Sequence, residues 1–373
     1  MLFVFLENIR DNHIHDVQLT PLKESVVDYS LIIYPLFIVG KSGVRFFHRS
    51  NSCSNTIHIG VPLPSFFFYC NIVFLPVIFL VGLPILLYYM ARLKITDIIA
   101  RNYLSSLFSC CAKVLMPQVK VIADLRSLYP EEGAIVRRWS FQGFDYKQWR
   151  SLERFICRKS DKVFCISPTM KSIIDSRCAG AATYYVPAFV PSNIKFSIKD
   201  RLFIRDCLGI SDKLVFIYVG SFGLWHTSEA LKRILRSHVN PENDAVLLYI
   251  GNDSKRFGKS MDIDNLKIIN LSSIKNSEMF KYLSAADVSI LPGNDSNHEV
   301  VQTFNSMLQP SKFQEYLACG LPVLLNDSLE NVKLNFSDML FSQKFSDHER
   351  LMASKKYRGL FSQSSITLNY VEY

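Results

Sequence analysis

The sequence predicts an α/β protein with two domains, each built on a parallel sheet. Short apolar runs of strand length alternate with segments of helical length along most of the chain, which is the pattern of βαβ units. The 373 residues are too many for one domain of ordinary size. Two prolines, Pro187 and Pro191, interrupt the pattern near the middle of the chain and mark a linker.

In the first half, apolar runs predict strands and the segments between them predict helices. The run at residues 2–6 has no basic segment before it and no small-residue cleavage site after it, so it indicates a buried strand and not a signal peptide. Ser167 and Pro168 fit the N-cap and the first turn of a helix. The predicted strands span residues 2–6, 31–39, 57–61, 96–101, 119–124 and 162–166, and the helices span residues 103–115 and 145–159.

In the second half the same alternation starts again after the prolines. Strands are predicted at residues 214–219, 245–250, 266–271, 288–291 and 322–325. We therefore expect domains at residues 1–187 and 188–345, followed by a helical segment at residues 346–373 that packs back toward the first domain. In such sheets a ligand binds at the carboxyl ends of the strands.

The longest uncharged stretch, residues 66–91, has 26 residues and is long enough to cross a bilayer. Pro76, Gly82 and Pro84 interrupt it, and a true span would separate the first strands from the sheet that they need as a partner. A buried or interface-dipping helix is the preferred interpretation, and a full span remains the alternative.

The charge lies mostly in the first half of the chain. Residues 1–186 carry 21 basic and 13 acidic side chains, a net charge of +8, whereas residues 187–373 carry 21 and 20, a net charge of +1. The basic stretch at residues 137–162 includes Trp139, Phe144 and Trp149, which suits an anionic lipid surface or, equally, a solvated helix face. No nucleic-acid-binding module is recognisable, so a membrane surface is the expected partner. The nine scattered cysteines indicate a reducing, cytoplasmic environment.

Two motifs in the second half suggest a site for a phosphorylated ligand. Gly220, Ser221 and Gly223 follow a strand and precede a helix, where backbone N–H groups approach phosphates, although glycine also serves the turn itself. In Pro-Ser-Lys-Phe-Gln-Glu, starting at residue 310, Lys312 and Glu315 lie on one face of a helix start. Such a glutamate binds ribose hydroxyls and such a lysine neutralises phosphate, unless the two simply form a surface ion pair.

Together these motifs resemble family 4 of the glycosyltransferases, in particular bacterial members that build capsule or O-antigen polysaccharide. The resemblance rests on the Pro-Ser-Lys-x-x-Glu-Tyr-Leu-Ala-x-Gly-x-Pro-Val block, the Tyr-Val-Gly-Ser turn, residues 160–167 and residues 124–133, and it covers residues 96–330 in order. It implies the GT-B architecture of two Rossmann-like domains, an N-terminal one for the acceptor and a C-terminal one for the nucleotide-sugar donor. It also implies retention of anomeric configuration and no metal requirement.

The resemblance assigns roles to particular residues. Glu315 binds the donor ribose, Ser311 and Lys312 line the donor pocket, and the glycine turn lies under the diphosphate. In the first domain the implied catalytic candidates are Asp124, Arg126, Glu131 and Glu132.

The sequence departs from the family pattern at three places. Met307 stands where the family has a second glutamate. No Arg and Lys pair follows Gly223, but Lys255 and Arg256, which follow the strand at residues 245–250, could substitute for it. His13 and His15 replace the glycine-rich acceptor loop. Asp262 and Asp264 form an Asp-x-Asp pair, but they precede a strand in a parallel fold, so no metal site is predicted.

The sequence therefore predicts a hexosyl- or N-acetylhexosaminyltransferase at the cytoplasmic face of a bacterial membrane. The expected substrates are a UDP- or GDP-linked sugar and a polyprenyl-diphosphate-linked saccharide. The alternative is a non-catalytic partner that binds a sugar nucleotide or lipid in a polysaccharide biosynthesis complex.

Overall fold

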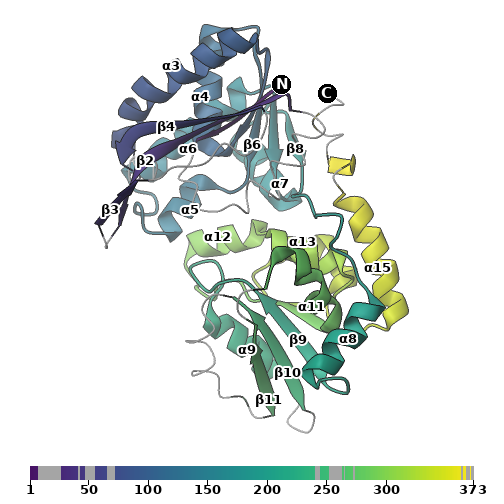
Figure 1. Cartoon of the computed structure of the whole chain (residues 1–373). Helices are drawn as coiled ribbons and strands as arrows, with labels where there is room; N and C mark the ends of the chain where they lie inside the picture. Colours follow the sequence, from purple (N-terminus) through teal and green to yellow (C-terminus); the bar gives the residue numbers. More distant parts are fainter. Residues whose placement is uncertain are drawn as a thin grey trace. The chain divides into compact units, whose positions relative to one another are not determined.

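The computed structural model describes residues 1–6, 27–40, 43–46, 55–64, 72–239, 244–251, 263, 265–271, 274–362, 364–366 and 370. The chain forms two compact units (Figure 1). The first comprises Met1–Pro187 with Asn369–Tyr373, and the second comprises Ala188–Leu368. The change of unit thus falls at the first of the two prolines that interrupt the sequence pattern.

The first unit is built on a sheet with the strand order β3-β2-β1-β5-β6-β7-β8, in which β4 also pairs with β2. All pairings are parallel except that of β3 with β2. The strands are β1 (Leu2–Leu6), β2 (Tyr29–Gly40), β3 (Gly43–Phe46), β4 (Thr56–Pro64), β5 (Asp97–Arg101), β6 (Lys120–Leu125), β7 (Lys162–Cys165) and β8 (Thr183–Tyr185). The helices are η3 (Ile72–Phe74), α3 (Leu75–Leu93), α4 (Asn102–Leu115), α5 (Tyr129–Ile135), α6 (Phe144–Lys159) and α7 (Pro168–Arg177).

The central strands form because their residues are apolar on both faces. All five residues of β1 are buried, as are the last four of β5 and the last five of β6. Continuous burial of this kind is typical of a parallel strand covered by helices on both sides. The helix α7 begins where the sequence predicts it, because the Ser167 hydroxyl accepts a hydrogen bond from the Met170 N–H at 3.1 Å.

The basic, aromatic stretch departs from its membrane interpretation at its tryptophans. Trp139 and Trp149 are buried and pack around Tyr129, with the ring centroids of Trp149 and Tyr129 4.8 Å apart. The Trp139 indole N–H also donates to the Pro130 carbonyl at 2.9 Å. These side chains stabilise the interior of the first unit and do not lie at headgroup depth, whereas Phe144 is exposed.

The second unit is built on a parallel sheet with the strand order β11-β10-β9-β12-β13. The strands are β9 (Leu214–Val219), β10 (Ala245–Ile250), β11 (Leu266–Asn270), β12 (Val288–Leu291) and β13 (Val323–Leu325). The helices are α8 (Ile198–Leu208), α9 (Ser228–His238), η4 (Asn276–Glu278), α11 (Met279–Ala285), α12 (Glu299–Met307), α13 (Ser311–Ala318), α14 (Glu330–Asn335), η5 (Ser337–Met339) and α15 (Asp347–Leu360).

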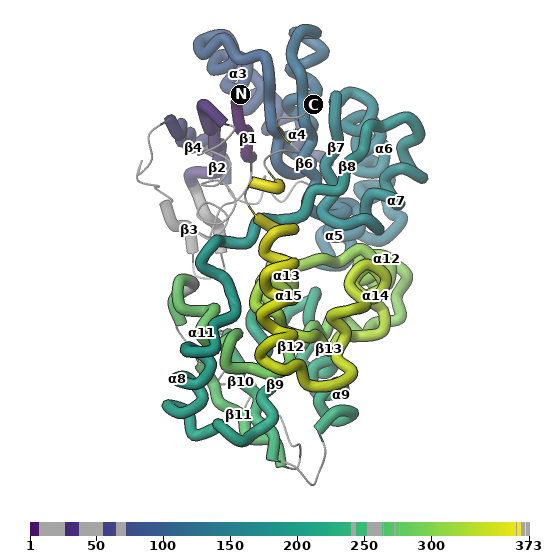
Figure 2. Tube along the Cα trace, turned by 90° about the vertical axis from the view of Figure 1, so that its right-hand side faces the viewer, coloured from purple at the N-terminus to yellow at the C-terminus, as the bar shows by residue number. Residues whose placement is uncertain are grey.

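The C-terminal segment divides between the two units. The helix α15 lies alongside α13 in the second unit (Figure 2), while the last five residues group with the first. Gly320, which ends α13 with a φ of +61°, lets the two helices approach closely, since a Cβ there would lie 2.1 Å from the Arg350 carbonyl oxygen. The predicted segment at residues 346–373 is therefore partly a component of the second unit.

A buried ion cluster ties α8 to the sheet of the second unit. The Asp287 carboxylate precedes β12 and accepts hydrogen bonds from Arg201 at 2.6 Å and from Arg205 at 3.1 Å. It also accepts from the Val215 N–H at 2.9 Å, at the start of β9. Both carboxylate oxygens thus have partners, as a charge at this depth requires.

Candidate functional site

The sheet of the second unit has its topological switch point between β9 and β12. From β9 the chain moves to one side through β10 and β11, then returns to the other side with β12 and β13. The loops after β9 and β12 diverge there and leave the crevice in which ligands bind in open α/β sheets. The Thr227 N–H donates to the Gly293 carbonyl at 2.9 Å and ties these loops together.

Gly220 lies directly after β9, at a position that only glycine can occupy without strain. Its φ is +130°, and a Cβ there would lie 2.6 Å from the Lys312 Nζ. The ammonium group lies 4.9 Å from the centroid of the Tyr218 ring. A cation over an aromatic face is held electrostatically, so the glycine turn and Lys312 form one local arrangement.

The helix α13 is fixed to the end of β9 by Tyr316. The phenol of this fully buried residue accepts a hydrogen bond from the Val219 N–H at 3.0 Å. Lys312 and Glu315 lie in the first turns of the same helix. The anchoring of Tyr316 therefore holds the start of α13, with both charged residues, against the carboxyl end of β9.

Burial shifts both charged groups away from their ordinary behaviour. It lowers the pKa of Lys312 from 10.5 to about 8, against the opposing effect of Glu315. Burial likewise raises the pKa of Glu315 from 4.5 to about 7, although Lys312 lowers it. The ion pairs in the described part of the chain do not include one between these two residues. The simple surface ion pair is thus not what the structure has. Shifted pKa values of this kind are frequent at functional sites, and the role of both residues in donor binding stays a prediction.

The structure adds His226, which the sequence interpretation passed over. Its side chain is 6% exposed, and its Nδ1 has no hydrogen-bond partner within the part of the chain that the structure describes. The ring lies edge-on to Tyr218, with centroids 6.4 Å apart. Burial lowers the pKa of His226 well below 6.5, and Lys312 lowers it further, so the imidazole is neutral. The sequence pattern did not indicate His226, because a neutral ring contributes no charge to a diphosphate site. Its position just before the N-terminus of α9 is the feature of the sequence that could have indicated it.

The other predicted donor residues differ in their involvement. Ser221 is exposed, and its carbonyl accepts from the Tyr218 hydroxyl at 3.2 Å. The Gly223 N–H donates to the His226 carbonyl at 2.9 Å, which closes the turn, and Ser311 is the first residue of α13. Met307 is buried at the end of α12, so the position of the missing glutamate belongs to the interior of the unit.

Several predicted residues lie outside the described part of the chain: His13, His15, Lys255, Arg256, Asp262 and Asp264. Among the residues that are described, no group of three His, Cys, Asp or Glu side chains could hold a metal ion. The absence of a metal requirement stays a prediction.

In the first unit, Asp124 and Arg126 come together at the carboxyl end of β6. The Asp124 Oδ2 accepts from Arg126 at 2.8 Å and from Arg101, the last residue of β5, at 3.2 Å. The Asp124 Oδ1 is buried and has no partner among the described residues. Arg126 also donates to the Tyr370 hydroxyl at 3.1 Å, and burial raises the pKa of that phenol. Two guanidinium groups thus share one carboxylate at the edge where an acceptor is expected.

Glu131 and Glu132 have hydrogen-bond partners outside this cluster. The buried Glu131 carboxylate accepts from Arg177 at 2.7 Å and from Tyr146 at 2.8 Å, and these contacts join α5, α6 and α7. Glu132 accepts a hydrogen bond from the Ser127 hydroxyl. The structure gives Glu131 a positioning role within the unit, and the catalytic role of both residues stays a prediction.

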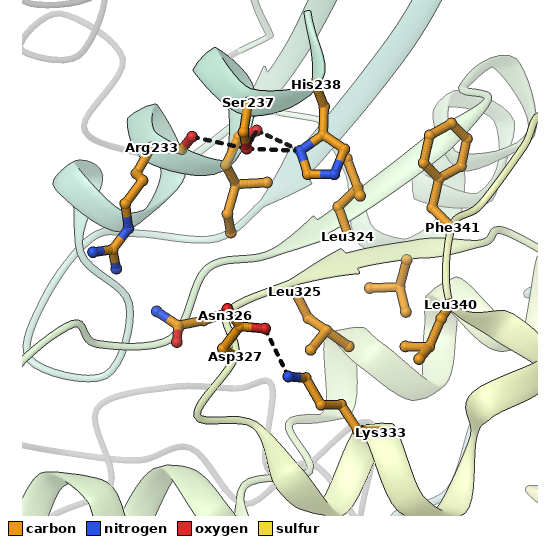
Figure 3. A pocket seen from close by; sticks show the side chains of 12 residues that line it. Arg233, Ser237, His238, Leu324, Leu325, Asn326, Asp327, Lys333, Leu340 and Phe341 are labelled. Atoms are coloured by element: carbon orange, nitrogen blue, oxygen red, sulfur yellow. Dashed lines mark hydrogen bonds and ion pairs between the residues drawn. The ribbon is translucent and has the colours of Figure 1, made fainter.

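A separate pocket of about 650 Å³ lies along β13 in the second unit (Figure 3). It is lined by apolar side chains of β13 and by charged groups from α9 and α14, including Arg233 and Lys333. Lys333 is already paired with Asp327 at 2.7 Å. None of the predicted site residues lines this pocket, so it is distinct from the candidate donor site.

The two units, each built on a mainly parallel sheet, have the architecture of the GT-B glycosyltransferase fold. The structure is similar to sucrose-phosphate synthase from Thermosynechococcus elongatus, with a TM-score of 0.64 and 14% identity over 100% of this chain and 98% of that chain. It is also similar to HepE from Anabaena in complex with UDP, with a TM-score of 0.60 and 11% identity over 100% and 99% of the two chains.

A third similar structure is α,α-trehalose 6-phosphate synthase from Burkholderia multivorans, with a TM-score of 0.59 and 11% identity over 100% and 95% of the two chains. No family model and no curated protein matches the sequence. At these identities the likeness establishes the fold. It confirms the predicted α/β architecture of two units on parallel sheets, whereas the narrower family 4 assignment stays a prediction.

Proposed function

We propose that the protein is a retaining glycosyltransferase that moves a sugar from a UDP- or GDP-linked donor to a lipid-linked saccharide. The observation that carries this proposal is the arrangement of Lys312 and Glu315 at the switch point beside Gly220. The similar structure of HepE was determined with UDP and also with UDP-glucose, which supports a nucleotide sugar as the donor.

The chemistry of these side chains suits the breaking of a sugar–diphosphate bond. Negative charge grows on the departing diphosphate, and a cation with little hydration stabilises such charge strongly. The Lys312 ammonium over the Tyr218 ring supplies that cation. The Glu315 carboxylate, once ionised, accepts hydrogen bonds from two ribose hydroxyls and so fixes the nucleotide.

In the first unit the residues suit an acceptor with an anionic group. Arg101 and Arg126 share the single carboxylate of Asp124, which leaves net positive charge at the carboxyl end of β6. A polyprenyl-diphosphate-linked saccharide has both the anion and the hydroxyl that the reaction needs. Because its polyprenyl chain lies in a membrane, the enzyme would act at the cytoplasmic face of that membrane. A role in capsule, O-antigen or lipopolysaccharide synthesis follows from this acceptor class.

Transfer assays with purified protein, UDP- and GDP-sugars and a lipid-linked acceptor test the proposal. We expect Glu315→Ala to abolish nucleotide binding while the melting temperature of the free protein stays the same or rises, because the variant loses a partly buried carboxyl that has no ion-pair partner among the described residues. Unchanged nucleotide affinity in this variant would contradict the assignment. Lack of both transfer and nucleotide binding in the wild type would refute the function as a whole.

The buried Met307 motivates a second candidate, a non-catalytic partner that binds a sugar nucleotide or lipid in a biosynthetic complex. This candidate predicts nucleotide binding that depends on Glu315, with no turnover across a panel of acceptors. The same assays therefore separate the two functions.

A further inference from the structure

The helix α3 carries two opposite apolar faces, and one of them is buried within the first unit. Leu75, Ile78, Gly82, Leu86 and Met90 recur at intervals of three or four residues and are buried. Gly82 allows close packing on α4, since a Cβ there would lie 2.7 Å from the Phe108 ring. The rings of Phe79 and Phe108 stack with centroids 4.3 Å apart. The helix therefore packs on α4 through Phe79 and Gly82, and Figures 1 and 2 show the two helices next to one another.

The opposite face of α3 is exposed and carries no charge before Arg92. We call this face, together with Val73 of the adjoining η3, the apolar stripe; it consists of Val73, Val77, Leu80, Pro84, Tyr88 and Ala91. Leu80 is 78% exposed and Val73 is 67% exposed. A surface helix of a globular protein normally has polar residues on its outer face, so an apolar face of this length requires a partner.

The structure argues against a transmembrane orientation of this helix. Within the described part of the chain, Ile72–Leu93 is the one helix long and apolar enough to cross a membrane. A spanning helix, however, would have to leave α4 and expose its buried face to lipid. Because the buried residues run from Leu75 to Met90, protein covers one side over nearly the whole length. The side opposite the buried residues is the one that can meet lipid without unpacking the helix, which places the helix axis parallel to the surface.

A basic face adjoins the start of the apolar stripe. The Ile72 N–H donates to the Asp145 carboxylate at 2.9 Å, which joins the start of α3 to the start of α6. The exposed positions of α6 carry Phe144, Lys147, Arg154 and Arg158. Of the acidic residues of this helix, Glu153 is fully buried and Asp145 is engaged by the Ile72 N–H. An exposed aromatic ring beside a row of cations complements a bilayer that contains anionic lipid.

We propose that the apolar stripe of α3, with the basic face of α6 beside it, docks the protein on an anionic lipid bilayer as an in-plane, non-spanning anchor. The proposal deepens the proposed function, because a lipid-linked acceptor would be met at that surface. The helix α6 follows β6 in the chain and its last residues lead into β7, so its start lies near the carboxyl end of the sheet, the edge that carries Asp124 and Arg126.

Vesicle flotation of the full-length protein tests this docking. We expect binding to phosphatidylcholine vesicles that contain phosphatidylglycerol, weaker binding to phosphatidylcholine alone, and release by an alkaline carbonate wash. Leu80→Glu should lower the partition coefficient about tenfold, because a charge replaces an aliphatic side chain that would otherwise be buried in lipid. The matched control is Leu334→Glu, at a residue 77% exposed in the second unit, which should bind as the wild type does.

The basic face is tested separately by Lys147→Glu, which should weaken binding to anionic vesicles and leave binding to phosphatidylcholine unchanged. Equal binding by Leu80→Glu and the wild type would overturn the proposal, as would resistance to carbonate, which indicates a span. A concentration-dependent dimer that Leu80→Glu abolishes, without vesicle binding, would assign the stripe to self-association instead. UDP and GDP binding, measured in parallel without vesicles, reports on the proposed function independently of these outcomes.

Discussion

Replacing Lys312 by methionine should make the free protein more stable and its nucleotide binding weaker. Methionine keeps the apolar stem against Tyr218 and removes only the charge. The fall of the Lys312 pKa from 10.5 to about 8 means that folding disfavours the ammonium form. At about 1.4 kcal/mol per tenfold change in acidity, this is a cost of about 3 kcal/mol.

The expected gain in stability is smaller than this cost, because the side chain is only partly buried and solvent screens its charge. We expect Lys312→Met to raise the free energy of unfolding by about 1–2 kcal/mol at pH 7. A charge-assisted hydrogen bond contributes about 1.5–3 kcal/mol, so affinity for UDP or GDP should fall about 10- to 100-fold.

The pH dependence of stability gives a second signature. Between the folded pKa of about 8 and 10.5, the unfolded chain binds a proton at Lys312 that the folded chain has released. The stability of the wild type should therefore rise with pH across this window, and Lys312→Met should lack that contribution. Glu315 acts in the opposite direction, because its raised pKa makes stability fall as the pH rises from 4.5 to about 7.

Urea unfolding across pH 5–10 and calorimetric titration with UDP and GDP measure both effects. Lys281→Met is the matched control, since Lys281 pairs with Glu278 on the surface and should change neither quantity. A destabilised Lys312→Met variant, or one with wild-type affinity, would refute the idea that Lys312 is an uncompensated cation held for an anionic ligand.

Three further predictions follow from the same unit. His226→Phe keeps the ring packing and removes Nδ1, which has no hydrogen-bond partner among the described residues. Nucleotide affinity should therefore fall about tenfold with little change in melting temperature. An equal loss of affinity in the control variant His238→Phe would contradict a specific role of His226. Gly220→Ala should lower the free energy of unfolding by about 1–3 kcal/mol, because alanine strains the backbone at this φ, and should weaken nucleotide binding, because its Cβ displaces Lys312. A wild-type free energy of unfolding together with wild-type nucleotide affinity would refute this prediction.

Asp287→Asn should destabilise the second unit by about 3–5 kcal/mol in urea, because Arg201 and Arg205 lose their buried counter-charge. Although burial by itself would raise the pKa of Asp287, the two arginines lower it below 3.8. Its stabilising contribution is therefore present above that value and is lost as the pH falls through the folded pKa. A loss below 1 kcal/mol would mean that the cluster is solvated.

The sequence alone indicated most of the candidate donor residues, because the motifs that contain them are local in the chain. The strand run before Gly220, the glycine turn and the Pro-Ser-Lys-x-x-Glu helix start each depend on neighbours within a few residues. Their order along the chain also predicted two units with parallel sheets, which the fold confirms. The end of the first unit at Pro187 could also be predicted from the sequence, since proline constrains the backbone wherever it occurs.

What the sequence could not supply was the environment of each side chain. Composition gave Trp139 and Trp149 a membrane interpretation, and only packing around Tyr129 shows that they are interior residues. His226 became a candidate when folding buried its ring beside Lys312 and left Nδ1 with no hydrogen-bond partner among the described residues.

The uncharged stretch at residues 66–91 shows the same division between sequence and tertiary structure. The sequence by itself determined that a long apolar helix would form, because apolarity and helical length are properties of consecutive residues. Only the tertiary structure decided that one face of α3 packs on Phe108 while the other remains exposed. Burial, ion pairing and exposure depend on residues distant in sequence, and folding alone brings those residues together.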